Sequence, residues 1–193
     1  MTIIGTNLQR KEGADKVTGR AVYVDDLTFE GMLYGDTVRS SRCHARIRSI
    51  RRDESFDWTG ITLADASDIP GDNVVALIEN DQPVLAAGVV RHKHEPLVLL
   101  ACNDRVRLRE ARAHILIDYE DLDAVLDAEQ SVASPVPIWP PDNVFKAIAI
   151  EKGDLAEGFR QSVRVVEETY RVGPQEQLYI ETQGMIAVPD PAG

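Results

Sequence analysis

Six arginines gather in one short stretch of the chain, where they could bind phosphate groups or pair with carboxylates. They lie within 14 residues that contain no acid: Arg39, Arg42, Arg46, Arg48, Arg51 and Arg52. Strand alternation would place Arg46 and Arg48 on one face with His44. No aromatic side chain is interleaved on which bases could stack, which argues against nucleic acid. We expect a solvated strand face that forms salt bridges with the acidic run at 118–127, with contact to another protein as the alternative.

Adjacent carboxylates are a second candidate chemistry, at Asp25-Asp26, Glu120-Asp121 and Glu167-Glu168. Neighbouring residues in a strand point to opposite faces, so these pairs cannot converge on one substrate atom. For the same reason we expect Cys43 to be a core cysteine beside an exposed His44, and not half of a thiolate pair. GxSxG, GxGxxG and a glycine-rich phosphate loop with lysine are all missing from the sequence. The residues alone therefore predict no catalytic site.

Composition and charge exclude several classes of protein. With 21 Lys plus Arg against 32 Asp plus Glu, the net charge is −11, which opposes general binding to nucleic acid. The 44% hydrophobic and 27% charged residues are typical of a folded protein. His92 and His94 stand two apart and not four, so we expect no metal site in this chain. No apolar run approaches the roughly 18 residues of a membrane span, and the start lacks a signal-peptide pattern, so we expect a cytoplasmic protein with reduced thiols and no membrane contact.

Hydrophobic patterning predicts an α+β domain in the first two thirds of the chain. Residues 10–19 are expected to form an extended arm, residues 63–68 a single helical turn, and residues 72–82 a long loop. A helix is expected over about 105–113, after an N-capping Asn103 or Asp104. Strands are expected at 21–24, 33–38, 44–50, 97–101 and 115–119, of which 97–101 is apolar enough to be buried on both faces.

A change of composition divides the chain near residue 131. Four prolines between Ser131 and Pro141 are typical of a semi-rigid connector. A short helix at about 155–161 and strands at 163–172, 178–182 and 184–188 should follow. A sheet of two or three strands without helices is marginal alone, so we expect this region to be the beginning of a larger domain.

Short motifs follow one another in a specific order over about residues 8–189. They are KVTGRAVYVDD (16–26), GMLYG (31–35), VRSSRCHARI (38–47), ASDIPG (66–71), DYEDLDAVLD (118–127), EKGDL (151–155) and QEQLYIET (175–182). This ordered set resembles the molybdenum-binding subunit of the xanthine dehydrogenase and aldehyde oxidase family, the molybdenum hydroxylases.

The resemblance implies a division into domains. It implies an N-terminal arm at 1–15, an α/β hammerhead domain of mixed sheet and short helices at 16–128, a proline-rich connector at 129–145, and the truncated start of the molybdopterin-binding domain at 146–193. The fold class is therefore α+β, followed by an incomplete β-rich segment of a larger domain.

The sequence departs from the family pattern at two positions. His94 stands where the family usually has glycine in Val-Arg-x-x-Gly-Glu-Pro, which aligns with residues 90–96. If that glycine serves a positive φ angle, the histidine costs about 1 kcal/mol. Gln177 replaces a residue that is commonly histidine.

The resemblance also implies function. The chain would be an N-terminal fragment or split subunit of a hydroxylase that oxidises a purine, N-heterocycle or aldehyde, and would be inactive alone because the catalytic glutamate and the cofactor-contacting loops lie further downstream. Molybdenum-molybdopterin would bind only in the assembled enzyme, with iron-sulfur centres and FAD on partner chains. The implied partners are the remaining molybdopterin-binding chain, an iron-sulfur subunit and an FAD subunit.

One pair of residues in this chain is a candidate for contact with substrate. The resemblance implies that an apolar pair after the Asp-Ile-Pro-Gly turn lines the substrate channel, here Leu77 and Ile78; the alternative is that they anchor their own loop. No catalytic, cofactor-binding or metal-binding residue is assigned. A freestanding hammerhead-type module for assembly or binding is the alternative function, and an unrelated nucleotide-binding or nucleic-acid-binding protein is the third.

Overall fold

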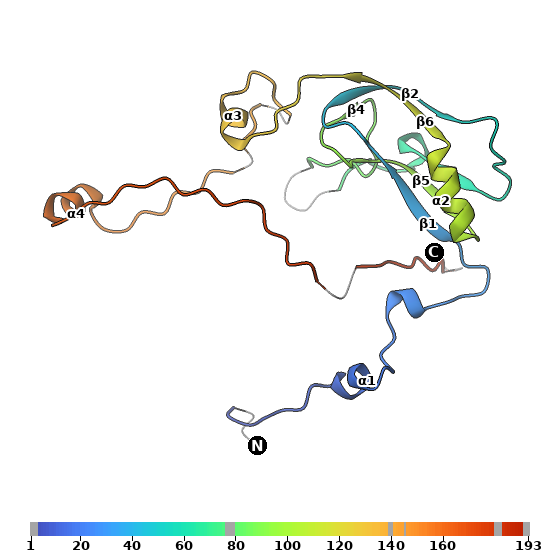
Figure 1. Ribbon diagram of the computed structural model, residues 1–193, viewed down its shortest axis with the longest axis horizontal. Coiled ribbons are helices and arrows are strands. Elements are labelled where there is room, and N and C mark those ends of the chain that lie inside the picture. Colours follow the sequence, from blue (N-terminus) through green and yellow to red (C-terminus); the bar gives the residue numbers. More distant parts are fainter. Residues whose placement is uncertain (1–3, 76–79, 139–140, 145, 180–182, 191–193) are drawn as a thin grey trace. The chain divides into compact units, whose positions relative to one another are not determined.

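The computed structural model describes residues 4–75, 80–138, 141–144, 146–179 and 183–190 (Figure 1). By its internal contacts the chain divides into two compact units. One unit is Gly31–Ile150, and the other combines Met1–Glu30 with Glu151–Gly193.

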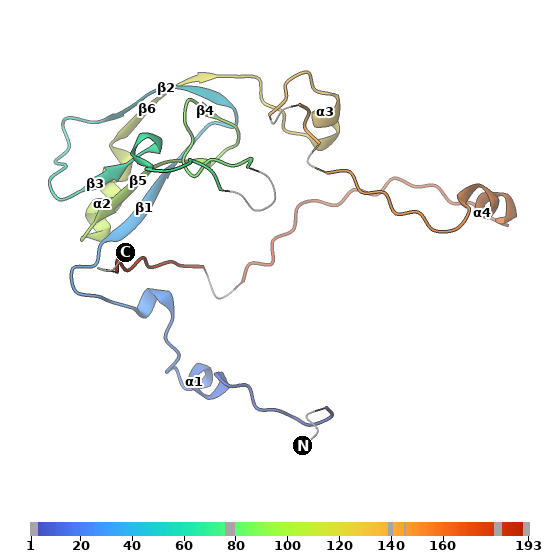
Figure 2. The ribbon, with the colours of Figure 1, turned by 180° about the vertical axis from the view of Figure 1, so that it is seen from behind.

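Two three-stranded antiparallel sheets build the unit Gly31–Ile150 (Figures 1 and 2). The first sheet has the order β1-β5-β3, formed by β1 (Tyr34–Arg39), β5 (Pro96–Cys102) and β3 (Thr62–Ala64). The second has the order β4-β2-β6, formed by β4 (Val89–Val90), β2 (Ala45–Arg52) and β6 (Ile115–Asp121). The expected α+β class is confirmed.

β5 is the central strand of the first sheet and the most buried element of the unit. Its apolar run places Leu97, Val98 and Leu100 in the core, each 2% exposed or less. Helix α2 (Arg105–Ala113) follows at once, and the Asp104 side chain caps it by accepting from the backbone N–H groups of Val106 and Arg107. The prediction of this capped helix is confirmed. The prediction of burial on both faces is wrong for one face of the strand, because Leu99 is 43% exposed and Ala101 is only half-buried.

The arginine-rich strand β2 pairs with the acidic strand β6. Arg46 lies opposite Glu120 in the register, and the Glu120 carboxylate contacts both Arg46 Nε at 3.3 Å and Arg48 Nη2 at 2.7 Å. Arg42 Nε contacts Asp121 Oδ1 at 3.1 Å. The predicted salt-bridged strand face is therefore confirmed. These five side chains are 42–67% exposed, so the pairs fix the register of the two strands more than they add stability.

Two short segments near the N-terminus differ from expectation. The strand expected at 21–24 is wrong, because Val24–Asp26 forms a 3₁₀ turn in which the Asp26 carboxylate accepts from the Tyr23 N–H at 2.9 Å. Within the expected extended arm, Gly13–Val17 forms the short helix α1. Turn-forming aspartate and glycine outweigh the β propensity of the valines in this stretch.

The helical turn expected at 63–68 is split between two structures. Thr62–Ala64 is strand β3, which pairs with β5, and only Ala66–Asp68 forms a 3₁₀ turn. The Asp65 carboxylate starts that turn by accepting from the Ser67 N–H at 2.7 Å.

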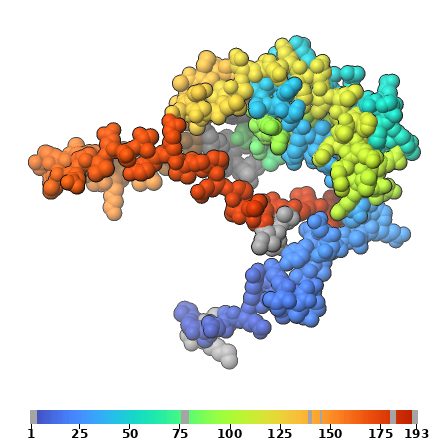
Figure 3. Space-filling model, in the orientation of Figure 1, coloured from blue at the N-terminus to red at the C-terminus, as the bar shows by residue number. Residues whose placement is uncertain are grey.

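The C-terminal region contains fewer elements than the sequence predicts. The helix expected at 155–161 is confirmed as α4 (Leu155–Gln161), and a short helix α3 (Ala128–Ala133) precedes it. The strands expected at 163–172, 178–182 and 184–188 are wrong for the described residues, which run without regular structure and appear as a thin extended chain (Figure 3). A β-strand needs a partner for its backbone groups, and no described part of the chain supplies one there.

His94 adopts the left-handed conformation that its alignment with glycine predicts, with φ at 70°. Its backbone N–H donates to the Ser40 carbonyl at 2.9 Å, and its own carbonyl accepts from Arg39 Nη1 at 3.0 Å. These two bonds hold the turn in a conformation that an L side chain disfavours.

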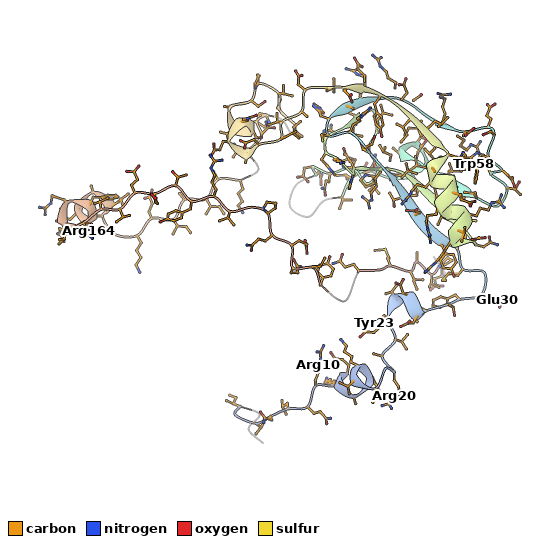
Figure 4. The ribbon with its side chains drawn as sticks, viewed as in Figure 1. Arg10, Arg20, Tyr23, Glu30, Trp58 and Arg164 are labelled. Carbon is orange, nitrogen blue, oxygen red and sulfur yellow. The ribbon has the colours of Figure 1, made fainter. Side chains whose placement is uncertain are left out.

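A cluster of contacts around Asp53, here called the Asp53 clasp, joins the end of β2 to the start of β6. Asp53 N–H donates to the His114 carbonyl at 2.9 Å, and His114 Nδ1 lies 2.9 Å from Asp53 Oδ2. Phe56 stacks on the His114 ring with centroids 4.5 Å apart, and the Trp58 indole donates to the Asp53 carbonyl at 2.8 Å (Trp58 is labelled in Figure 4). Hydrogen bonds lower the pKa of Asp53 to about 2. The bond from His114 has the largest effect, and the bonds from Ser55 come next.

Replacing the strained residue is the first test of this fold. We expect His94→Gly to stabilise the chain by about 1 kcal/mol, because glycine adopts positive φ without steric cost. Urea unfolding followed by circular dichroism measures the difference. His92→Gly is the matched control, since His92 has no positive φ and should gain nothing. A His94→Gly variant that is less stable than the parent chain would contradict this account of the turn.

The Asp53 clasp predicts a pH-dependent stability. Because the folded pKa of Asp53 lies below the ordinary 3.8, its stabilisation is present above pH 3.8 and is lost as the pH falls toward about 2. Asp53→Asn should therefore lower Tm at pH 7, and its difference from the parent should shrink between these two pH values. Thermal melts over that range measure it, with the exposed neighbour change Glu54→Gln as control. A difference that is independent of pH would contradict the assignment.

Candidate functional site

The loop that carries the candidate channel pair is tied to the core at both ends. Leu77 and Ile78 lie outside the described residues, so their channel role stays a prediction. Asn73, at the start of the loop, binds the backbone of Leu85 at its end. Its Nδ2 donates to the Leu85 carbonyl at 2.7 Å, and its Oδ1 accepts from the Leu85 N–H at 3.1 Å; this pair of bonds is here called the Asn73 clasp. A bridge between Val75 and Gln82 continues this pairing. The loop therefore leaves the core at a fixed place.

Asn73 is a positioning residue that the sequence reasoning missed. Leu85, which it holds, is 2% exposed, and Ala86 next to it donates its N–H to the Pro96 carbonyl at the start of β5. The clasp thus connects the loop to the central strand. An asparagine amide carries both a donor and an acceptor and can replace one backbone pairing, which is the signal that could have identified it. A cavity of about 250 Å³ beside the clasp is lined in part by Asn73, Asn80 and Asp81.

A larger cavity, of about 640 Å³, lies between β1, β6, α2 and the His94 turn. Four of its lining side chains are basic, namely Arg39, Lys93, His94 and Arg112, and no described side chain in its lining is acidic. Only Arg39 belonged to the arginine group noted in the sequence. The other three come from distant parts of the chain, so their gathering follows from the fold.

The remaining candidate chemistries do not form sites. Glu120 and Asp121 pair with arginines, and the described side chains of Glu167 and Glu168 are exposed. The expectation of a core Cys43 is wrong, because it is only half-buried, while His44 Nδ1 lies 2.6 Å from the Asp123 carbonyl.

Neither a metal site nor a complete cofactor site is found among the described residues. No three His, Cys, Asp or Glu side chains gather there as metal ligands. Over the described part of residues 151–190 nearly every side chain is exposed, so these residues do not by themselves form a molybdopterin cradle. No helix in the described part of the chain is long and apolar enough to cross a membrane.

Two family descriptions match this chain in succession. "Aldehyde oxidase and xanthine dehydrogenase, a/b hammerhead domain" matches residues 18–123, and "molybdopterin cofactor-binding domain" matches residues 138–193.

Similar proteins and structures agree with these matches. A probable xanthine dehydrogenase subunit of Bacillus subtilis (strain 168) is 33% identical over 187 residues, which cover 95% of this chain and 25% of that protein. The nicotinate dehydrogenase large molybdopterin subunit of Eubacterium barkeri is 29% identical over 193 residues, with 99% and 45% covered. The structure of reconstituted CO dehydrogenase from Oligotropha carboxidovorans is similar with a TM-score of 0.62 and 30% identity, over 68% of this chain and 17% of that one.

The chain spans 25% of the length of the Bacillus subtilis relative and 45% of the length of the Eubacterium barkeri relative. The hammerhead match alone covers more than half of the chain, in the region of the two sheets and α2. The chain therefore belongs to the aldehyde oxidase and xanthine dehydrogenase family.

Proposed function

We propose that this chain contributes the hammerhead domain and the first part of the cofactor-binding domain to a molybdenum hydroxylase that oxidises a purine, N-heterocycle or aldehyde. The remaining cofactor-binding polypeptide, an iron-sulfur subunit and an FAD subunit would complete the enzyme. Relatives named xanthine dehydrogenase, nicotinate dehydrogenase and nicotine 6-hydroxylase support the substrate class. In the completed enzyme, bound molybdenum-molybdopterin would supply the oxidation chemistry.

The observation that carries this proposal is the unpaired segment after α4. Residues 163–172 are rich in β-branched and aromatic residues, yet Val163, Tyr170 and Val172 are each more than 80% exposed. Arg164, labelled in Figure 4, lies at the start of this extended segment. Burying a valine or larger apolar side chain contributes about 1.5–3 kcal/mol, so such a strand is stabilised strongly when another polypeptide pairs with it.

The alternative is a freestanding hammerhead-type module for assembly or binding. The compact unit Gly31–Ile150 favours it, because this unit has its own core around Leu97, Leu100 and Val90. The module would need no partner for stability, whereas the enzyme part would.

Complementation distinguishes the two functions. We expect the purified chain alone to contain no molybdenum by elemental analysis and to turn over no N-heterocycle or aldehyde, and to gain both when co-expressed with polypeptides that carry the rest of the enzyme. Val166→Asp should abolish co-purification because it breaks the apolar strand, whereas Val17→Asp, a change at a similarly exposed valine in α1, should not. Stoichiometric molybdenum and turnover in the single chain would contradict the proposal. A stable chain that never assembles would support the module.

The channel role of the apolar pair is tested in the same assembled enzyme. Leu77→Ala or Ile78→Ala should change KM or substrate preference with stability nearly intact, since truncating a solvent-facing side chain costs little. Val84→Ala, in the stem of the same loop, is the control and should leave the kinetics unchanged. A stability loss of about 2–4 kcal/mol with unchanged kinetics would instead show that the pair anchors the loop.

A further inference from the structure

A glycine in the C-terminal segment leaves no room for a side chain. A methyl group at Gly184 would lie 2.8 Å from Cγ1 and 3.1 Å from Cβ of Val24. Carbon atoms in contact normally stay about 3.5–4.0 Å apart, so the backbone at Gly184 lies directly against the Val24 side chain. Among the glycines of the described residues, only at Gly184 would a Cβ come closer than 3.0 Å to another atom. Gly184 has no positive φ, so the glycine is needed here for space and not for backbone conformation.

The residue two places further along is the one that is covered. Ile186 is half-buried, and it is the only apolar side chain in the described part of residues 151–190 that is not exposed. Met185, between Gly184 and Ile186, is 91% exposed. In extended backbone, residues two apart share a face and the residue between them points away (Figure 3). Gly184 and Ile186 therefore share the face that is turned to the contact with Val24.

The turn that receives Gly184 is held by its own hydrogen bonds. The Asp26 carboxylate accepts from the Tyr23 N–H at 2.9 Å, and the Asp26 N–H donates to the Tyr23 carbonyl at 3.0 Å. The Leu27 N–H donates to the Val24 carbonyl at 3.2 Å. Lys16 Nζ lies 6.0 Å from the centroid of the Tyr23 ring, labelled in Figure 4, and so connects the turn to α1. A surface that is ordered in advance loses little entropy when a segment docks on it.

The contacts and the sequence match divide the chain at different places. By internal contacts, residues 1–30 group with residues 151–193 and not with the unit that holds the two sheets. The hammerhead description nevertheless begins its match at residue 18. Within this stretch Val24 is 38% exposed against 66% for Val22, in agreement with the cover that the C-terminal segment gives it.

We propose that the turn Val24–Asp26 is an internal docking site for residues 183–190, and that residues 18–30 belong structurally to the cofactor-binding domain and not to the hammerhead domain. The occupant is a segment of this chain, because Gly184 fits against Val24 where a larger residue would not. The apolar side chains on the two sides of the contact suit each other without any charged group. The inference does not depend on the proposed activity or on any partner chain.

Disulfide trapping in the 193-residue chain tests the contact. The two Cβ atoms of a disulfide lie about 3.5–4.5 Å apart, close to the 3.1 Å between Val24 Cβ and a Cβ at position 184. Val24→Cys with Gly184→Cys should therefore cross-link in most molecules on mild oxidation. Peptide mapping by mass spectrometry identifies this link and separates it from any link to the native Cys43 and Cys102. Val24→Cys with Gly173→Cys is the matched control, because a Cβ at Gly173 meets no other atom of the described chain within 4 Å.

Two results of the trapping would overturn the proposal. One is the absence of a link between positions 24 and 184. The other is equal cross-linking of the test pair and the control pair, which would show chance encounters of a flexible chain.

Hydrogen exchange in the intact chain tests the division into domains. Gly184→Val crowds Val24, so the backbone N–H groups of Asp26 and Leu27 should exchange at least about threefold faster. Gly173→Val, at a position with free space, should leave them unchanged, and β5 in the other unit should keep its exchange rates in both variants. In a Val24→Ala background the effect of Gly184→Val should shrink, since the Cγ atoms that the new side chain would strike are missing.

The proposal is overturned if exchange in the turn does not respond to Gly184→Val, or if the two valine substitutions have equal effects. Faster exchange in β5 together with the turn would show that residues 18–30 belong with the hammerhead domain, and would overturn the division.

Discussion

The burial of β5 at the centre of its sheet is the constraint on which the hammerhead unit depends. Its neighbours β1 and β3 pair with it from either side, and α2 leaves directly from its end and packs back through Leu108 and Ala111. Val38 lies opposite Val98, so the core of the first sheet is built across this pairing. The loops that carry the candidate sites all begin or end near this strand, because both Ser40 and Ala86 form backbone bonds to residues at its entrance.

The elements that the sequence predicts well are those whose signals are local. The continuous apolar run of β5, the alternation of β2 and the aspartate that starts α2 each determine their structure within a few residues. The arginine and acidic runs also predict a long-range feature, because opposite charges on two strands indicate which strands pair. The failures have the opposite cause. Residues 163–172 have strand composition, but a strand exists only with a partner, and the described chain contains none for them.

The candidate sites divide in the same manner. The left-handed turn at His94 could be predicted, because a glycine position constrains one backbone angle regardless of context. The gathering of Lys93, Arg112 and Tyr119 around one cavity could not be predicted, since it depends on how β1, β6 and α2 are placed in space. The Asn73 clasp falls between these cases: its chemistry is visible in the residue type, but its partner Leu85 lies twelve residues away.

Because of the Asn73 clasp, the structure of the core does not depend on the length of the loop. Since the asparagine amide closes the loop at its base, residues added or removed between it and Leu85 change the closure entropy but need not shift β5. Doubling the length of a flexible loop costs only about 0.6 kcal/mol. A change in the length of this loop can therefore leave the sheet beneath it unchanged.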